Sequence, residues 1–146
     1  MTKDEILEFI KANEPHPLHD CAKSNNLDDF IQLQKNESFS DMLLRLIREK
    51  GLSEVDVYKN AGITAQHFSK IRSDRAYRPT KETVLAFAVA LKLDLPQTKD
   101  LMRSAGLAFT HANKTDMVVE YFIINENWNI FEINEALDNL GLNPLK

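Results

Sequence analysis

The chain has 146 residues and an ordinary apolar fraction, which suits one domain with short extensions. Its one cysteine, Cys21, excludes an internal disulfide, and no stretch of about 18 apolar residues could cross a membrane. The N-terminal residues are acidic and have no signal-peptide core, so we expect a cytoplasmic protein.

The formal charge of −4 is unevenly distributed. Residues 1–37 hold four Lys/Arg against eight Asp/Glu, residues 38–110 hold twelve against eight, and residues 111–146 hold two against six. A basic middle between acidic ends is typical of a nucleic-acid-binding centre, although counts this modest also arise by coincidence. We therefore predict an acidic helical N-terminal extension, a central domain and a helical C-terminal extension over these ranges.

The N-terminal extension contains two short amphipathic patterns. The first, in residues 1–14, ends at Pro15, and the second covers Leu27–Gln34 with Asn26 as its cap. Helices this short need packing partners to be stable. The segment between them carries metal-ligand side chains, His16, His19 and Cys21, but no fourth ligand at a suitable spacing, so we expect no metal site.

The central domain is predicted to hold five helices between Ser38 and Gly106. The first has apolar residues at core-facing helical spacing, namely Phe39, Met42, Leu43, Leu46 and Ile47. The second, Ser53 to Asn60, is expected to bury Val55 and Val57. These five helices, joined by short loops, predict a compact all-α fold.

A tight turn and a short polar helix follow the second helix. Gly62 supplies the positive φ that the turn needs, and Thr64 is placed to cap a helix that runs to about Ser73. Phe68 and Ile71 share its apolar side. The opposite side is polar and carries Gln66, Lys70 and Ser73. A short helix that displays polar side chains is typical of an element that reads a DNA groove.

The last two helices of the domain have clear start signals. Thr80 precedes a helix that is apolar on nearly all sides, which is typical of the centre of a bundle. Asp94 is expected to cap the fifth helix, with Pro96 in its first turn, and Gly106 to end it.

Two further helices are predicted in the C-terminal extension. Asp116 is expected to cap an apolar helix, and Asn129 to begin a last helix that ends at Gly141. The inward side of the last helix is predicted to consist of Ile133, Ala136, Leu137 and Leu140. Because a helix this apolar must be covered, either by the domain or by another chain, we expect a possible homodimer or partner contact through Tyr121, Phe122, Ile124, Trp128 and Phe131.

The helix order and several motif positions together resemble the lambda-repressor-like (Xre-type) helix-turn-helix family, over roughly residues 38–106. The residues that carry the resemblance are Gly51-Leu52-Ser53, Val57, Ala61-Gly62-Ile63-Thr64, Phe68, Ile71 and Arg78-Pro79. The resemblance implies a helix-turn-helix bundle that binds double-stranded DNA sequence-specifically, with the helix at about 64–73 in the major groove.

The resemblance also implies a set of DNA-binding residues. Gln66 could pair with adenine, and Lys70 could reach guanine or a phosphate. Arg72, Arg75, Arg78 and Lys81 would hold phosphates. The whole implied set is Thr64, Gln66, His67, Ser69, Lys70, Arg72, Arg75, Arg78 and Lys81.

Two positions depart from the family pattern. Glu54 stands where family members usually carry a glutamine that contacts the DNA backbone, and Arg72 stands where many carry an acidic residue. Arg72 is expected to pair with Glu54 or Glu49. Such a pair would either neutralise Glu54 or show that this face no longer binds DNA.

We therefore predict a DNA-binding transcriptional regulator, a repressor or an activator by recruitment, that acts as a dimer on a palindromic operator. The alternative is a protein-interaction adaptor or inhibitor that reuses the same scaffold to bind another bacterial or phage protein, with the acidic extensions as possible partner contacts. No phosphate-binding loop, metalloprotease motif or nucleophile elbow is present, so we expect neither an enzyme nor a cofactor.

Overall fold

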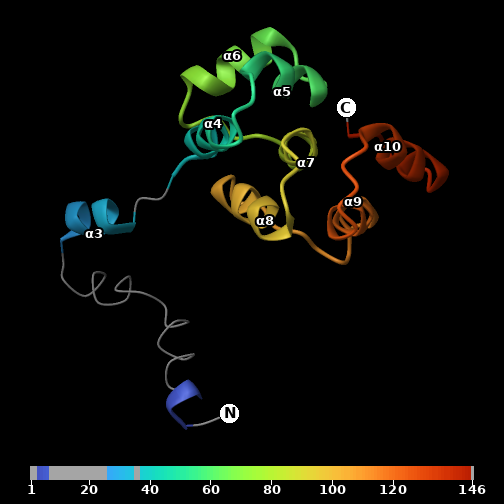
Figure 1. The fold of residues 1–146 in the computed structure, drawn as a ribbon. Helices are drawn as coiled ribbons and strands as arrows, with labels where there is room; N and C mark the ends of the chain where they lie inside the picture. Colours follow the sequence, from blue (N-terminus) through green and yellow to red (C-terminus); the bar gives the residue numbers. More distant parts are fainter. Residues whose placement is uncertain (1–2, 7–25, 35–36, 146) are drawn as a thin grey trace. The chain divides into compact units, whose positions relative to one another are not determined.

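The computed structural model describes residues 3–6, 26–34 and 37–145, and all regular elements in these ranges are helices, which confirms the all-α class (Figure 1). The chain forms two compact units, Met1–Asn36 and Glu37–Lys146. In the first unit residues 3–6 are helical and α3 covers Leu27–Gln34. Asn26 caps α3 as predicted, since its Oδ1 accepts from Asp29 N at 3.2 Å. The rest of the helix predicted in residues 1–14, together with His16, His19 and Cys21, lies outside the described residues.

The second unit contains seven helices. They are α4 (Phe39–Glu49), α5 (Glu54–Asn60), α6 (Ala65–Ser73), α7 (Lys81–Ala90), α8 (Leu95–Ser104), α9 (Lys114–Ile124) and α10 (Ile130–Asn139). The five helices predicted between Ser38 and Gly106 are thus all present. Figure 1 shows α7 in the middle of the unit, with α5 and α6 beyond one side of it and α8 on the other.

Polar caps start the helices where the sequence predicted them. The side chains of Ser38, Thr64, Thr80 and Asp94 each accept from the backbone N–H three residues further along. At Asp94 the pairing is reciprocal, because Gln97 Oε1 also accepts from Asp94 N at 3.2 Å. Each such cap stabilises its helix by about 1 kcal/mol. Local sequence therefore determines where these helices begin.

The core forms around α7. Its residues from Thr83 to Val89 are all buried, as expected for a helix that is apolar on every side. The Phe87 ring lies 6.3 Å from the rings of both Phe39 and Phe68, so α4 and α6 are packed on the same central side chain. Ring pairs at this separation add to the free energy of apolar burial.

Two predicted core residues are exposed. Val55 is 44% exposed, because it lies two positions, or about 200°, round α5 from the buried Val57. Leu140 is also exposed: its spacing continues the stripe of Ile133 and Leu137, but it is the C-cap residue, one position beyond the end of α10 at Asn139. The prediction that these two side chains face inward was wrong.

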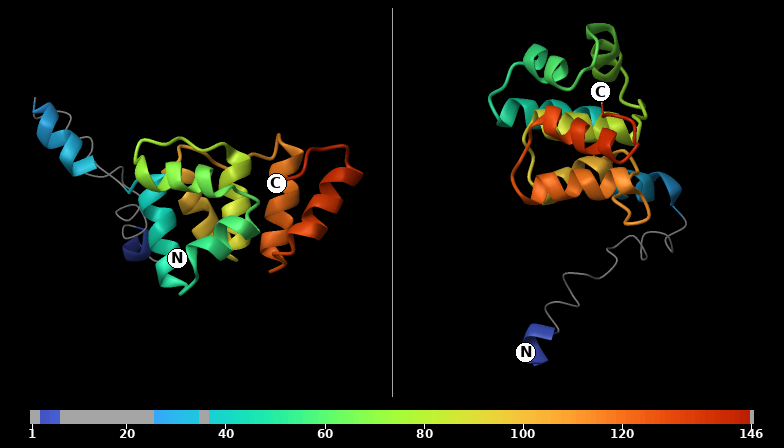
Figure 2. Two further views of the ribbon diagram at one scale, coloured as in Figure 1. Left: turned by 90° about the horizontal axis from the view of Figure 1, so that it is seen from above. Right: turned by 90° about the vertical axis from the view of Figure 1, so that its right-hand side faces the viewer.

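The C-terminal helices pack on the helix-turn-helix part rather than standing apart from it. Figure 2 shows α9 and α10 side by side at one end of the unit, and α9 also contacts α8. Val119, Ile123, Ile133 and Leu137 are buried in the same apolar core as α7. Trp128 Nε1 donates to Leu93 O at 2.9 Å, which joins the α9–α10 connection to the α7–α8 connection. Residues 37–145 therefore share one core.

The start of α9 differs from the prediction. Asn113, and not Asp116, caps this helix, with its side chain accepting from Asp116 N at 3.2 Å. Asp116 instead lies inside the first turn and is buried. An aspartate in the first turn is favourable beside the helix N-terminus, so local sequence permits either position.

Candidate nucleic-acid interface

The turn between α5 and α6 has the geometry that its glycine requires. Gly62 has φ 71°, and the turn closes through Ile63 N donating to Tyr58 O at 2.8 Å. Across the turn the rings of Tyr58 and Phe68 stack with centroids 5.2 Å apart. Phe68 and Ile71 are buried beneath α6. The helix is therefore held rigidly, with its remaining sides facing outward.

The outward side of α6 carries the residues predicted to meet DNA. Gln66, Ser69 and Lys70 are exposed, and their side chains have no partner among the described residues. Thr64 is also exposed, but its hydroxyl accepts from His67 N at 3.1 Å and so is committed to the cap. The polar groups available at this surface are thus the Gln66 amide, the Ser69 hydroxyl and the Lys70 ammonium.

His67 is less accessible than expected for a surface contact. It is half-buried, and its Nε2 shares a hydrogen bond with the Tyr77 hydroxyl. Burial raises the pKa of Tyr77, so this hydroxyl stays protonated near neutral pH. The two rings also meet edge to face, with centroids 5.7 Å apart. His67 therefore ties α6 to the loop that follows it.

That loop, residues 74–80, is anchored at both of its ends. Asp74 Oδ1 accepts from Ala76 N at 2.9 Å, and Ser40 on α4 donates its hydroxyl to Asp74 O at 3.2 Å. Pro79 is buried. Between these anchors Arg78 is exposed and has no ion-pair partner among the described residues. The loop thus carries an exposed Arg78 directly after Tyr77, whose side chain contacts His67 on α6.

Two of the other predicted phosphate-binding arginines are paired with carboxylates. Arg72 Nη1 lies 2.7 Å from Glu54 Oε2, which confirms the pairing expected from the sequence. Arg75 Nε lies 3.5 Å from Asp41 Oδ1, although its side chain is largely exposed. Exposed pairs of this kind contribute little to stability and exchange readily with other partners. Both guanidinium groups can therefore still turn towards an external anion.

Lys81 differs from these arginines because its partner is buried. Its Nζ lies 2.9 Å from Asp116 Oδ2, and the two side chains are 23% and 1% exposed. Asp116 Oδ2 also accepts from Thr110 N at 2.9 Å, while Oδ1 is buried with no partner. The pair joins residues 35 positions apart, and no spacing in the sequence signals it. Lys81 is thus engaged in holding α9 against the start of α7.

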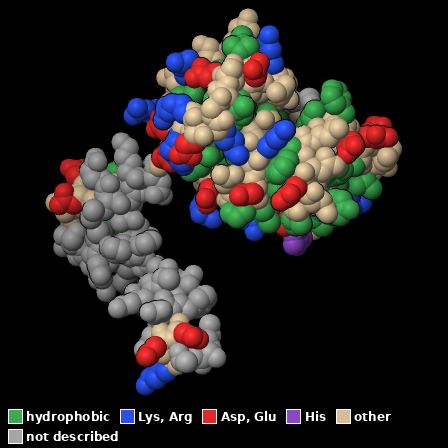
Figure 3. All heavy atoms as spheres, in the orientation of Figure 1, with side chains coloured by type: hydrophobic (Ala, Val, Ile, Leu, Met, Phe, Trp, Pro, Cys, Tyr) green, Lys and Arg blue, Asp and Glu red, His purple; other side chains and the backbone are tan. Residues whose placement is uncertain are grey.

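The surface has two distinct regions (Figure 3). Lys and Arg side chains, interleaved with carboxylates, gather over the part of the unit formed by α4, α5 and α6, and apolar side chains are more frequent over α9 and α10. Of the residues predicted for a dimer or partner contact, Tyr121, Ile124 and Phe131 are exposed, whereas Phe122 and Trp128 are half-buried and packed against the core.

Residues 42–103 match the family model of the Cro/C1-type helix-turn-helix DNA-binding domain. The match covers α5 to α7 with most of α4 and α8, and it confirms the resemblance inferred from the sequence. This part of the chain is therefore similar in sequence and helix order to helix-turn-helix DNA-binding domains of the Cro/C1 type. The C-terminal helices α9 and α10 lie outside the matched range.

No curated protein and no solved structure matches the chain. Within the described residues, none of the helices is both long and apolar enough to cross a bilayer.

Proposed function

We propose that the protein is a transcriptional regulator that binds duplex DNA sequence-specifically, with α6 in the major groove. The observation that supports this most directly is the polar face of α6. Gln66, Ser69 and Lys70 are exposed and unpaired there, directly above the buried Phe68 and Ile71. A rigid helix with free donors on its outer side is the arrangement that base-edge recognition requires.

The proposed contacts fall into two kinds. Gln66 is suited to a bidentate pair with adenine, and Lys70 to the O6 and N7 acceptors of guanine. Arg78 has a free guanidinium on an anchored loop and is assigned to a backbone phosphate. Arg72 and Arg75 would join it after exchanging their carboxylate partners for phosphates. Lys81 is left out of the contact set, because its ammonium is held by the buried Asp116.

A dimer is part of the same proposal. Two copies related by a two-fold axis would place two α6 helices in successive major grooves of a palindromic operator. We assign this contact to Tyr121 and Ile124, which are exposed apolar side chains on α9.

The second candidate function is a protein-interaction adaptor or inhibitor built on the same scaffold. It is favoured by the ion pairs of Arg72 and Arg75, which lower the positive potential around α6.

Selection of bound duplexes from a random library, with the full chain as bait, distinguishes the DNA-binding regulator from the adaptor. A regulator yields a recurrent motif whose enrichment is lost in Lys70→Glu, while an adaptor yields no motif even at low salt.

Replacing Glu54 by glutamine tests the role of the Arg72 pair. We expect the Glu54→Gln variant to bind the selected duplex about fivefold more tightly, because one phosphate-repelling carboxylate is removed and Arg72 is released. Fluorescence anisotropy of labelled duplex measures the change. Asp100→Asn is the matched control, since it makes the same charge change and also releases an arginine, Arg103, on α8. An equal gain in both variants would show that only net charge matters.

A further inference from the structure

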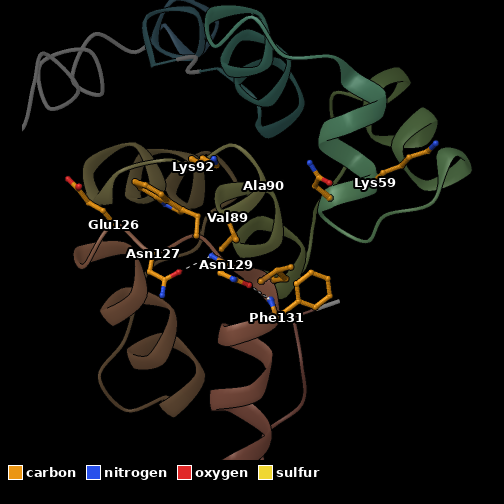
Figure 4. A pocket seen from close by; sticks show the side chains of 11 residues that line it. Lys59, Val89, Ala90, Lys92, Glu126, Asn127, Asn129 and Phe131 are labelled. Carbon is orange, nitrogen blue, oxygen red and sulfur yellow. Dashed lines mark hydrogen bonds between the residues drawn. The ribbon is translucent and has the colours of Figure 1, made fainter.

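A hollow of about 670 Å³ lies between the helix-turn-helix part and the C-terminal helices. Its lining comes from the end of α5, the end of α7 and the connection from α9 into α10. Figure 4 shows Lys59 and Glu126 at opposite ends of the hollow, with Asn129 and Phe131 between them. The volume is within the range of small-molecule sites in proteins.

Part of the lining of the hollow is apolar. Val89 and Ala90 from α7 and Ile130 at the start of α10 are buried or half-buried and line the hollow. Phe131 is 80% exposed, the highest value among the large apolar side chains of the described residues. An aromatic ring held this far into solvent has a whole face available for stacking against a ligand.

Several polar side chains around the hollow are available to bind a ligand. Lys59, Asn60, Lys92 and Glu126 have neither a hydrogen-bond nor an ion-pair partner within the described part of the chain. By contrast, the indole of Trp128 is committed to Leu93 O. The unengaged set has two ammonium groups against one carboxylate. The hollow therefore carries an excess positive charge, and the Lys59 end is free of acidic lining residues.

The backbone of the lining is held in an unusual conformation at two positions. Lys92 and Glu126 have φ of 53° and 54°, and they are the positive-φ residues other than glycine among the described residues. Each follows the C-cap residue of a helix, α7 or α9, where glycine is the usual choice. An L-residue costs about 1–2 kcal/mol there. Strained positions of this kind cluster at ligand sites, and both of these lie on the same hollow.

We propose that this hollow binds a small organic anion with an aromatic body. The ring lies over Val89, Ala90 and Ile130 and stacks on Phe131, and the anionic group lies at the end formed by Lys59 and Asn60. Such a ligand contacts α5 directly before the turn that leads into α6, and at the same time it contacts the start of α10. The site is independent of the proposed DNA contacts, none of which lines the hollow.

The test uses the full chain and a matched pair of probes. The anion 1-anilinonaphthalene-8-sulfonate and the neutral N-phenyl-1-naphthylamine share the same ring system. Trp128 is the one tryptophan in the sequence and lines the hollow, so quenching of its fluorescence reports binding to the chain, and the variants below locate the site. We expect saturable quenching by the sulfonate, with a dissociation constant lower than that of the neutral probe.

Three variants locate the site. Phe131→Ala is expected to raise the dissociation constant of both probes about tenfold, since one stacking face is lost. Lys59→Glu is expected to weaken the sulfonate about tenfold and to leave the neutral probe unchanged. Tyr121→Ala, which removes an exposed aromatic ring outside the hollow, is the control and should change neither. All three side chains are exposed, so the variants should keep the parent's circular dichroism spectrum.

Two results would overturn the proposal. Equal affinity for the two probes, unaffected by Lys59→Glu, would show that the hollow does not recognise an anion. Loss of quenching in Tyr121→Ala but not in Phe131→Ala would place the probe elsewhere on the C-terminal helices. Neither result depends on DNA binding.

Discussion

Reversing the charges of Lys70 and Arg78 together is expected to weaken binding to the selected duplex about 100-fold at moderate salt. Both side chains are exposed and unpaired within the described residues, so each substitution turns a free cation into a carboxylate facing phosphate. Neither side chain supports the core, and the variant should unfold at the parent's denaturant concentration. Fluorescence anisotropy over a salt series measures the affinity.

The single variants Arg78→Glu and Lys70→Glu should differ in how their loss of affinity depends on the DNA sequence. Arg78→Glu is expected to weaken selected and unrelated duplexes alike and to lower the slope of log K against log salt by about one, as loss of a phosphate contact does. Lys70→Glu should weaken the selected duplex more than an unrelated one, because a base contact is lost. The distinction assigns one residue to the backbone and the other to base recognition.

Lys99→Glu is the matched control for these variants. Lys99 is an exposed lysine on α8, and its substitution changes the net charge by the same amount as either single variant. Binding in this variant should fall only slightly. Should Lys70→Glu, Arg78→Glu and Lys99→Glu all bind alike, the outward face of α6 takes no part in DNA binding and the adaptor function is favoured.

Replacing Lys81 by methionine should lower the free energy of unfolding by about 3–5 kcal/mol, a large part of the stability of a small domain. The substitution removes the cation beside the buried Asp116 carboxyl, which keeps the Thr110 amide as its remaining donor while Oδ1 stays without a partner. An uncompensated buried charge is among the most costly defects in a protein interior. Urea unfolding followed by circular dichroism measures the loss.

A second substitution separates charge from packing at this site. In Lys81→Met/Asp116→Asn the buried group is neutral but still accepts from Thr110 N, so more than half of the loss should be recovered. Arg103→Met is the control, because it breaks the exposed Arg103–Asp100 pair and should change stability little. If Lys81→Met lowers the free energy of unfolding no more than Arg103→Met does, the Lys81–Asp116 pair does not hold α9 in place.

Much of the central domain could be predicted from local sequence. Ser38, Thr64, Thr80 and Asp94 begin helices because their side chains satisfy a backbone N–H three residues away, and this requires no distant partner. Gly62 turns the chain because it adopts a positive φ without steric cost. A pair between Arg72 and either Glu54 or Glu49 was also predictable from the sequence, and the structure shows Glu54 as the partner.

Other features depended on residues far apart in the chain. Asp116 can stand as a cap or within a first turn, and its burial follows from Lys81, which lies 35 residues earlier. Val55 and Val57 are both valines on one helix, and only the packing of α5 decides which of them is buried. The hollow joins α5, α7 and the α9–α10 connection, so no single stretch of sequence signals it.

The sequence by itself thus determined the helices, their caps and turns, the Cro/C1-type scaffold and the polar outer face of α6, because each of these depends on neighbours within a few residues or on a helical repeat. The tertiary structure decided which charges remain free. It leaves Lys70 and Arg78 unpaired and commits Lys81 to Asp116. It also places Phe131 at a hollow beside α5. The physical reason is that burial and charge pairing are set by contacts between distant segments, which only the folded chain brings together.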